Sequence, residues 1–338
     1  MVNIKDVAKL AGVAPITVSR VINHSGSVNP ATRERVQRAI NELHYVPNTL
    51  AQSLRSKQTH TIALLLSDIT NPFWTTIARG VEDAAAEKGF HTILCNTDED
   101  PEKEATYLNL LLQRRVDGIV IAPTTNDKLR LTALKRHQLP CVLIDRRVDG
   151  FKSDVVCGDN RGGAELLTEH LIRLGHRQIA LVSGPHSISS AEERAEGYRA
   201  ALRKHRIPIE ESLIFRGEFK QDSGYQLVKR LLERDPRPTA IFAANNLIAV
   251  GALQALREIG LRVPEDIALV CFDDIPYASA IEPFLTVVAQ PAYEMGRTAA
   301  GLLMERLAAT RNIRTREVVL APELVVRQSC GQMHHTTV

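Results

Sequence analysis

Two rhythms of apolar residues divide the chain. Up to about residue 46 the apolar positions recur at helical spacing, as in Ile4, Val7 and Ala11. From residue 61 onward, short apolar runs alternate with amphipathic stretches. The first rhythm predicts a small all-α head, and the second predicts a larger α/β body.

Segment 4–23 has the form of a helix, a glycine turn and a second helix. The second helix is expected from Pro15 to about Ile22, and a third follows the Asn29-Pro30 cap. In a helix-turn-helix, the second helix enters the major groove of DNA. A plain three-helix bundle has the same periodicity, so the periodicity alone leaves both interpretations open.

The apolar runs of the body predict strands, and the stretches between them predict helices. Strand–helix alternation indicates parallel sheets with helices on both faces, and about 270 residues of it indicate two doubly wound lobes. Ligands of such folds bind at the carboxyl ends of strands, in a crevice that closes by a hinge. The predicted strands are 61–66, 91–95, 118–122, 141–145, 154–158, 178–184, 239–243 and 267–272, and the predicted helices are 76–88, 102–114, 161–174, 192–205, 222–234 and 246–259.

These rhythms also predict the domain boundaries. The polar segment that follows the head, punctuated by Pro47, is expected to be a linker with some tendency to form a helix. We expect a head at 1–46, a hinge helix or linker at 47–60, a two-lobed ligand-binding and dimerisation body at 61–330 and a tail at 331–338. Within the body, the N-lobe is expected at about 61–158 and 291–318, and the C-lobe at about 159–290 and 319–330.

Charge is unevenly distributed along the 338 residues. Residues 1–60 hold eight Lys and Arg against three Asp and Glu, a net charge of +5, whereas the remainder holds 34 against 36 and nets −2. A basic head favours a polyanionic partner such as DNA. No apolar run approaches the ~20 residues of a membrane span, and the N-terminus lacks the apolar core of a signal peptide, so we expect a cytoplasmic protein.

Motifs of catalysis and cofactor binding are missing from the sequence. We find no G-x-G-x-x-G, P-loop, H-E-x-x-H or G-x-S-x-G pattern. The five cysteines show no metal-ligand spacing, so we expect reduced thiols and neither a metal nor a cofactor. An enzyme, or a sugar-binding transport protein with an incidental helical head, is therefore a disfavoured alternative.

The residues of the head make the DNA-binding interpretation specific. IKDVAKLAGVAPITVSRVIN, followed by TRERV and YVPN, closely resembles the head of the lactose-repressor family of bacterial transcription regulators over residues 4–57. The resemblance implies that Pro15, Ile16 and Arg20 read base edges, with Arg20 pairing with guanine. It implies phosphate contacts, which fix register, for Thr17, Ser19 and Asn23. The family usually has Ser or Thr at Ala14, so a helix cap is expected to be missing here.

Residues 47–57 match the family's hinge helix. In that family two such helices pair over the minor groove, and each inserts a leucine between base pairs. Leu54 stands at that position with Ala51 beside it, although a disordered tether with an incidental leucine is the alternative. Paired heads imply a homodimer on a nearly palindromic operator.

Polar and aromatic residues gather at the ends of the predicted strands of the body. Carboxylate, amide and guanidinium groups can bridge sugar hydroxyls, and flat aromatic rings can cover the apolar face of a sugar. An Asp or Asn after a strand is often only a helix cap, and we expect Asp274 and Asn246 to be structural. The strand-end candidates for ligand binding are Asn71, Phe73, Trp74, Asp145, Arg194, Asn245, Asp273 and Gln290, with Arg146 and Arg147 beside Asp145.

The body, over residues 61–328, resembles the sensor region of the same family, which is itself similar to periplasmic ribose-type binding proteins. The resemblance supports these candidates except Trp74 and adds Phe219 as an aromatic that stacks on the ligand. Asn245-Asn246 stands where the family usually has Asn-Asp, which leaves the role of Asn246 open.

Together these features predict a repressor of sugar-utilisation genes that a sugar or sugar phosphate releases from DNA. The alternative is a regulator of the same family that uses a purine or a phosphorylated carrier protein as co-repressor. Carrier-responsive members tend to lack the full set of sugar-binding residues. This chain keeps Asp145 and Arg194, which counts against a carrier protein.

Overall fold

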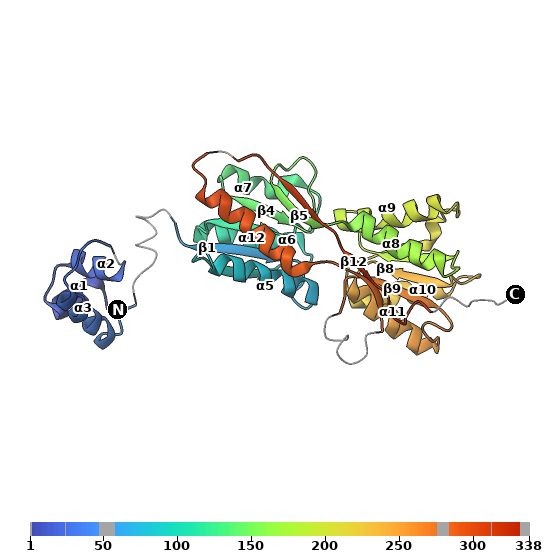
Figure 1. Ribbon diagram of the computed structural model, residues 1–338, viewed down its shortest axis with the longest axis horizontal. Coiled ribbons are helices and arrows are strands. Elements are labelled where there is room, and N and C mark those ends of the chain that lie inside the picture. The colour runs from blue at the N-terminus through green and yellow to red at the C-terminus, as the bar shows by residue number, and fades with distance from the viewer. Residues whose placement is uncertain (1, 24, 47–57, 276–283, 312, 332–338) are drawn as a thin grey trace. The chain divides into compact units, whose positions relative to one another are not determined.

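The computed structural model describes residues 2–23, 25–46, 58–275, 284–311 and 313–331. The chain forms two compact units, residues 1–59 and 60–338 (Figure 1). The predicted hinge helix lies outside the described residues up to position 57, and Ala51 and Leu54 with it.

The first unit is helical. Asn3 and Asp6 form a capping box at the start of its first helix, and Gly12 ends that helix with a φ of 63°, which a glycine adopts at little cost. The apolar stripes of the helices meet in a core of Val7, Ala8, Ala11, Val18, Val21, Val36 and Ala39. The helices described here are α1 (Ile4–Ala11), α2 (Pro15–Ile22) and α3 (Pro30–Glu42).

The N-lobe of the second unit is built on a parallel sheet with the strand order β11-β5-β4-β3-β1-β2. Ile62 and Leu64 pack against α5 and α12 on one face, and Ala63 and Leu65 pack toward α6 and α7 on the other, because successive strand residues point to opposite faces. The strands are β1 (Thr61–Leu66), β2 (His91–Asn96), β3 (Gly118–Ile121), β4 (Cys141–Ile144), β5 (Asp154–Gly158) and β11 (Glu317–Leu320). The helices are α5 (Pro72–Ala86), α6 (Pro101–Arg114), η1 (Lys128–Leu131), α7 (Thr132–Arg136) and α12 (Ala292–Ala308).

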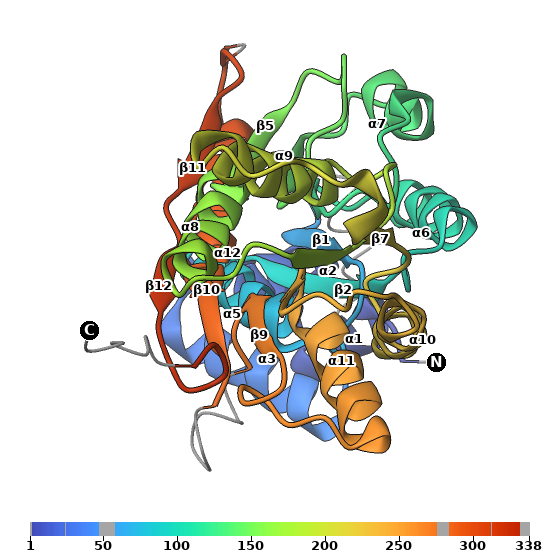
Figure 2. The same cartoon turned by 90° about the vertical axis from the view of Figure 1, so that its right-hand side faces the viewer.

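The C-lobe repeats this plan with the strand order β12-β10-β9-β8-β6-β7, in which only the β10–β12 pair is antiparallel among the described strands. Helices α8 and α9 pack together on one face, and α10 and α11 on the other (Figures 1 and 2). The strands are β6 (Ile179–Ser183), β7 (Ile214–Arg216), β8 (Ala240–Ala243), β9 (Ala268–Phe272), β10 (Thr286–Ala289) and β12 (Glu323–Val325). The helices are α8 (Asn160–Arg173), α9 (Ser189–Lys204), η2 (Glu211–Leu213), α10 (Gln221–Leu232) and α11 (Asn246–Ile259).

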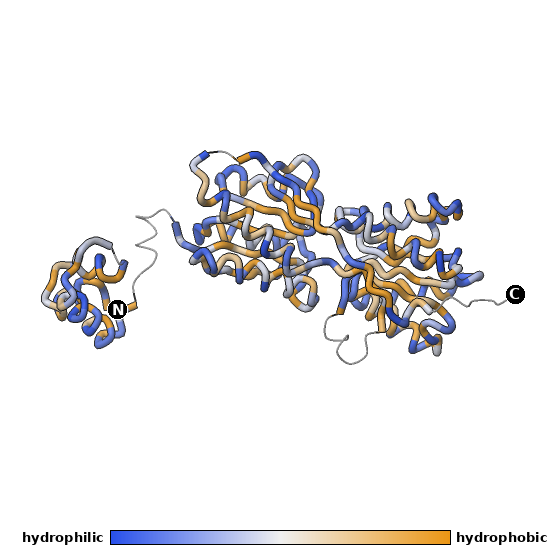
Figure 3. The backbone as a smooth tube through the Cα atoms, viewed as in Figure 1, coloured by the Kyte–Doolittle hydropathy of each residue, from blue (hydrophilic) through white to orange (hydrophobic). Residues whose placement is uncertain are grey.

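Three crossings of the chain join the two lobes. They lie between β5 and α8, between β10 and α12, and between β11 and β12. The central strands are the most apolar segments of both lobes (Figure 3). The predicted fold class, a helix-turn-helix head on a body of two doubly wound lobes, is confirmed. Among the described helices, none combines the length and the apolar character needed to cross a bilayer.

Candidate functional site

Helix α2 exposes one face on the surface of the head. Pro15, Ile16, Arg20 and Asn23 are exposed, while Thr17 and Ser19 are half-buried. The opposite face of the helix, with Val18 and Val21, belongs to the core. The N-cap residue Ala14 supplies no side-chain hydrogen bond.

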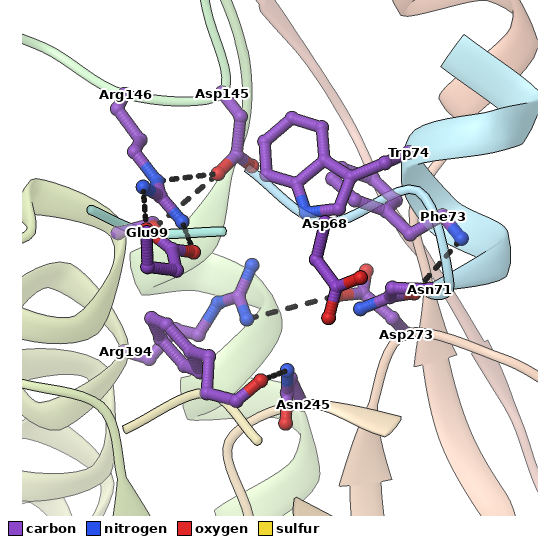
Figure 4. A pocket seen from close by; sticks show the side chains of 12 residues that line it. Asp68, Asn71, Phe73, Trp74, Glu99, Asp145, Arg146, Arg194, Asn245 and Asp273 are labelled. Atoms are coloured by element: carbon purple, nitrogen blue, oxygen red, sulfur yellow. Dashed lines mark hydrogen bonds and ion pairs between the residues drawn. The ribbon is translucent and has the colours of Figure 1, made fainter. Parts of the chain in front are cut away.

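A narrow cavity that opens to solvent lies between the lobes. Its walls come from the loops that follow the carboxyl ends of the strands and from the first turns of α5, α9 and α11 (Figure 4). The lining residues are Asp68, Asn71, Phe73, Trp74, Glu99, Asp145 and Arg146 from the N-lobe, and Ser190, Arg194, Phe219, Asn245 and Asp273 from the C-lobe.

Two aspartates occupy equivalent places in the two sheets. Asp145 directly follows β4 and donates its backbone N–H to Val156 (2.8 Å), and Asp273 directly follows β9 and donates to Val288 (2.9 Å). Both have left-handed backbones, with φ of 65° and 69°. This conformation costs energy for a non-glycine residue, and such strain concentrates at functional sites.

The Asp145 carboxylate is buried and incompletely paired. Only 3% of the residue is exposed. Its Oδ2 lies 3.4 Å from the Ser190 hydroxyl and 3.6 Å from Arg146 Nε, and its Oδ1 has no partner among the described residues. A buried carboxylate oxygen normally accepts a hydrogen bond, so this one is available to a ligand hydroxyl.

Arg194 is fixed from several sides. Its Nε donates to Asn160 Oδ1 (2.8 Å) and its Nη1 to the Ala244 carbonyl (2.5 Å), while its guanidinium lies 3.9 Å from the centre of the Phe272 ring. Its Nη1 is 3.6 Å from Asp273 Oδ2. The guanidinium is therefore held in place before any ligand binds.

Burial raises the pKa of Asp273 to about 6, although Arg194 and a hydrogen bond from Gln290 favour the charged form. The Gln290 amide donates to Asp273 Oδ1 over 2.8 Å. Near neutral pH this carboxyl is ionised and is an acceptor, and in mild acid it becomes a donor.

Arg146 is held by acceptors beside the Trp74 ring. It forms a bidentate pair with Glu99 (2.7 and 2.6 Å) and donates to the Pro123 carbonyl (2.9 Å). Its guanidinium lies 5.5 Å from the centre of the Trp74 ring. Burial alone would lower the pKa of Arg146, but Glu99 outweighs it and the pKa is raised, so the group stays charged.

Two lining asparagines are also helix caps. Asn71 Oδ1 accepts from the Phe73 N–H at the start of α5 (3.0 Å), and Asn245 Oδ1 accepts from Ile248 at the start of α11 (2.8 Å). Asn246 does not line the cavity, but its amide donates to Asn71 Oδ1 across the lobes (2.9 Å). An ionised aspartate at this position could not donate this bond. Asn246, whose role the sequence left open, therefore has a structural role.

Comparisons with known proteins agree with both halves of this arrangement. Residues 3–48 match the family model described as bacterial regulatory proteins, lacI family. Residues 59–326 match periplasmic binding proteins and the sugar binding domain of the LacI family. The chain belongs to the LacI family.

Curated relatives within the LacI family span its whole length. The regulator DegA of Bacillus subtilis is 40% identical, with 98% of each chain covered. The ribose operon repressor of Escherichia coli is 38% identical, covering 97% of this chain and 100% of that one. The repressor PurR of Aliivibrio salmonicida is 36% identical, covering 98% and 100%.

Solved structures give the same relationship. A lac repressor dimer bound to operator and the anti-inducer ONPF has a TM-score of 0.83 at 32% identity, covering 98% of this chain and 99% of that one. A LacI family regulator from Enterococcus faecium with bound ribose has a TM-score of 0.71 at 35% identity, covering 80% and 98%.

Most of the ligand-binding candidates of this LacI family member meet in the one cavity. The eight that line it are Asn71, Phe73, Trp74, Asp145, Arg194, Phe219, Asn245 and Asp273. Gln290 does not line it. The Gln290 side chain holds Asp273 and lines a neighbouring, solvent-open pocket. That these candidate residues contact a ligand remains a prediction.

Sequence reasoning did not select Asp68, Glu99 or Ser190, and it named Arg146 only as a neighbour of Asp145. Asp68 follows β1 in the same loop as Asn71, so strand-end placement could have found it. Glu99 lies in the loop that follows β2, so the same placement could have found it. Ser190 enters the cavity from the first turn of α9, and no local sequence signal marks it.

Proposed function

We propose that this LacI family member is a dimeric, sequence-specific repressor that an uncharged sugar releases from its operator. The observation that carries the proposal is Asp145 Oδ1, which has no partner among the described residues and faces Arg194 and Asp273 across a cavity between two lobes. A sugar hydroxyl supplies the missing donor, and contacts to both lobes favour closure. Release requires that the sugar bind the closed form better than the operator-bound form.

Charge in the cavity favours a neutral sugar over a sugar phosphate. Four carboxylates line it against two guanidinium groups, and each guanidinium is already paired with a carboxylate. A phosphate dianion would meet uncompensated negative charge there, whereas hydroxyl groups can donate to the carboxylates. The relatives named for ribose make this pentose the first candidate.

The head supports DNA binding through α2, with Pro15, Ile16 and Arg20 at base edges and Thr17, Ser19 and Asn23 at phosphates. We extend this proposal to the hinge residues Ala51 and Leu54, to a nearly palindromic operator and to a cytoplasmic location. A regulator must reach the chromosome, and the family members found are regulators rather than enzymes. The domain boundaries given above belong to the same proposal.

Trp74 offers a direct test, because it is the single tryptophan of the chain and lines the cavity. We expect its fluorescence to change on titration with ribose and to change far less with ribose 5-phosphate. Asp145→Asn should weaken ribose binding about 10- to 100-fold, because a hydrogen bond to a charged group is lost. Asp149→Asn, an equal charge change at an exposed site in the same loop, is the control.

Purine co-repression is the second candidate, because PurR is among the relatives and three aromatic side chains line the cavity. The same titration with hypoxanthine decides it. A response to hypoxanthine without one to ribose would replace the sugar proposal. A response to neither would remove the small-molecule site.

A further inference from the structure

An ion pair outside the cavity joins the two lobes. Arg147, which follows β4 in the N-lobe, donates from Nη1 to Glu193 of α9 in the C-lobe. The same guanidinium donates from Nε and Nη2 to Glu317 of β11 (2.8 and 2.6 Å), within the N-lobe. The Arg147 and Glu193 side chains are 29% and 27% exposed, so water screens their attraction only in part.

This pair is connected to the cavity by a chain of side-chain hydrogen bonds. Glu193 Oε2 accepts from Asn160 Nδ2 (3.2 Å), and Asn160 Oδ1 accepts from Arg194 Nε (2.8 Å). Asn160 is 1% exposed, so water does not compete for these two hydrogen bonds. Arg194 lines the cavity, but neither Asn160, Glu193 nor Arg147 does.

Only one link of this chain must break when the lobes separate. The Arg147–Glu317 pair lies within the N-lobe, and the Asn160–Glu193 and Arg194–Asn160 bonds lie within the C-lobe. The Arg147–Glu193 link spans both. The Arg147 backbone N–H adds a parallel bond to the Ser189 hydroxyl (2.8 Å). Burial raises the pKa of Glu193, so its charge depends on the nearby Arg147 for compensation.

We propose that Arg147 and Glu193 form a latch between the lobes that favours the closed form, so that residues outside the cavity set effector affinity. The inference rests on the proposed function, in which the closed form releases the operator. The apparent dissociation constant of a ligand is its intrinsic value divided by the fraction of molecules that are closed. A latch therefore acts equally on every ligand that needs the closed form.

The test is Glu193→Gln in the full chain. It should weaken the binding of ribose and of a second pentose, xylose, by the same factor, and tighten operator binding without ligand. The factor by which sugar affinity falls, multiplied by the factor by which operator affinity rises, equals the change in the ratio of closed to open molecules. We expect this product to be about three- to tenfold. A residue that touched the sugar would instead change the ratio of the two sugar affinities.

Glu211→Gln is the matched control, because it breaks a bidentate pair between α9 and η2 within the C-lobe, with Arg199 (2.9 and 2.8 Å). It should leave both affinities unchanged. Unchanged affinities in Glu193→Gln would overturn the latch. A simultaneous fall in sugar and operator affinity would also overturn it, since opening cannot weaken both.

Two further measurements keep the latch testable. If Glu193→Gln does not fold, Arg147→Met breaks the same link and carries the same expectations. If the wild type binds no sugar, the proposed function fails, but hydrogen exchange of the ligand-free chain still tests the latch. Exchange at residues 71–77 and 246–249 should be faster in Glu193→Gln than in Glu211→Gln, and equal rates would overturn the proposal.

Discussion

Asp145 and Asp273 show how two lobes of one plan converge on a single ligand. Each follows the strand at the same place in its sheet, and each has a left-handed backbone that turns the carboxylate into the cavity. They differ in their partners within the described part of the chain, since Asp145 keeps an unpartnered oxygen there while Asp273 is engaged by Gln290 and Arg194.

The pKa of about 6 at Asp273 predicts that effector binding weakens in mild acid. A sugar hydroxyl that donates to this carboxylate binds its ionised form, so ribose affinity should be about tenfold lower at pH 5 than at pH 7.5. Calorimetric titration at both pH values measures this. Asp273→Asn should bind weakly without this pH dependence, and equal wild-type affinities at both pH values would refute the role of Asp273.

The same group links folding to pH. Its pKa is raised above the ordinary value of 3.8, so between about pH 4 and pH 6 the folded carboxyl retains a proton that the unfolded chain has released. Its contribution to the free energy of unfolding therefore falls as pH rises through this window and is constant above it. Chemical denaturation at pH 4.5 and pH 6.5 measures this effect. Between these two pH values, the free energy of unfolding should lose less in Asp273→Asn than in the wild type.

Ala14 predicts a stabilising substitution in the head. Its backbone is extended (φ −72°, ψ 150°), as an N-cap requires, but it offers no side-chain acceptor. Ala14→Ser should stabilise α2 by about 1 kcal/mol and slow the hydrogen exchange of its first amides. Ala31→Ser is the comparison, because Asn29 already caps α3. Faster or unchanged exchange in Ala14→Ser would show that the cap is not limiting.

At the scale of elements, the sequence predicts those helices and strands whose apolar residues recur in a clear pattern. The runs around Ile62 and Val142 are apolar on both faces and flanked by amphipathic stretches, which marks central strands between helix layers. Edge strands β7 and β12 are only three residues long and half-buried or exposed, so no pattern distinguishes them from loops. Tertiary contacts alone assign them to a sheet.

The candidate site divides in the same way. Strand-end position predicted Asp145, Asp273 and the two capping asparagines, because the carboxyl ends of parallel strands meet at one edge of each sheet. The position of Gln290 is equally strand-terminal, yet its amide turns to Asp273 and not to the cavity. Orientation of a side chain depends on its partners, which the sequence does not specify.

Strand β2 predicts a subunit contact. It is an edge strand of its sheet, and Ile93 and Leu94 on it are 40% and 43% exposed. Exposed apolar residues on an edge strand invite pairing with another chain. Leu94→Lys should shift the protein from dimer to monomer in sedimentation and lower operator affinity at least tenfold. Leu110→Lys, with similar exposure on α6, should do neither, and a dimeric Leu94→Lys protein would place the contact elsewhere.

At the scale of the whole molecule, three crossings join the lobes, and the bonds between Asn71 and Asn246 and between Arg147 and Glu193 span them. We therefore expect the body to close and open as two rigid lobes. A ligand that contacts both lobes shifts this equilibrium by the difference of its affinities for the two forms. Typical coupling between effector and second ligand is about 5- to 150-fold.

The most direct test of the account is operator affinity with and without ribose. An operator is first selected from random-sequence DNA with the ligand-free protein, and its dissociation constant is then measured over a range of ribose concentrations. We predict that saturating ribose weakens operator binding of the wild type at least tenfold, and that Asp145→Asn needs about 10- to 100-fold more ribose for the same effect. Operator affinity that stays the same or rises while ribose occupies the cavity would contradict release by a sugar.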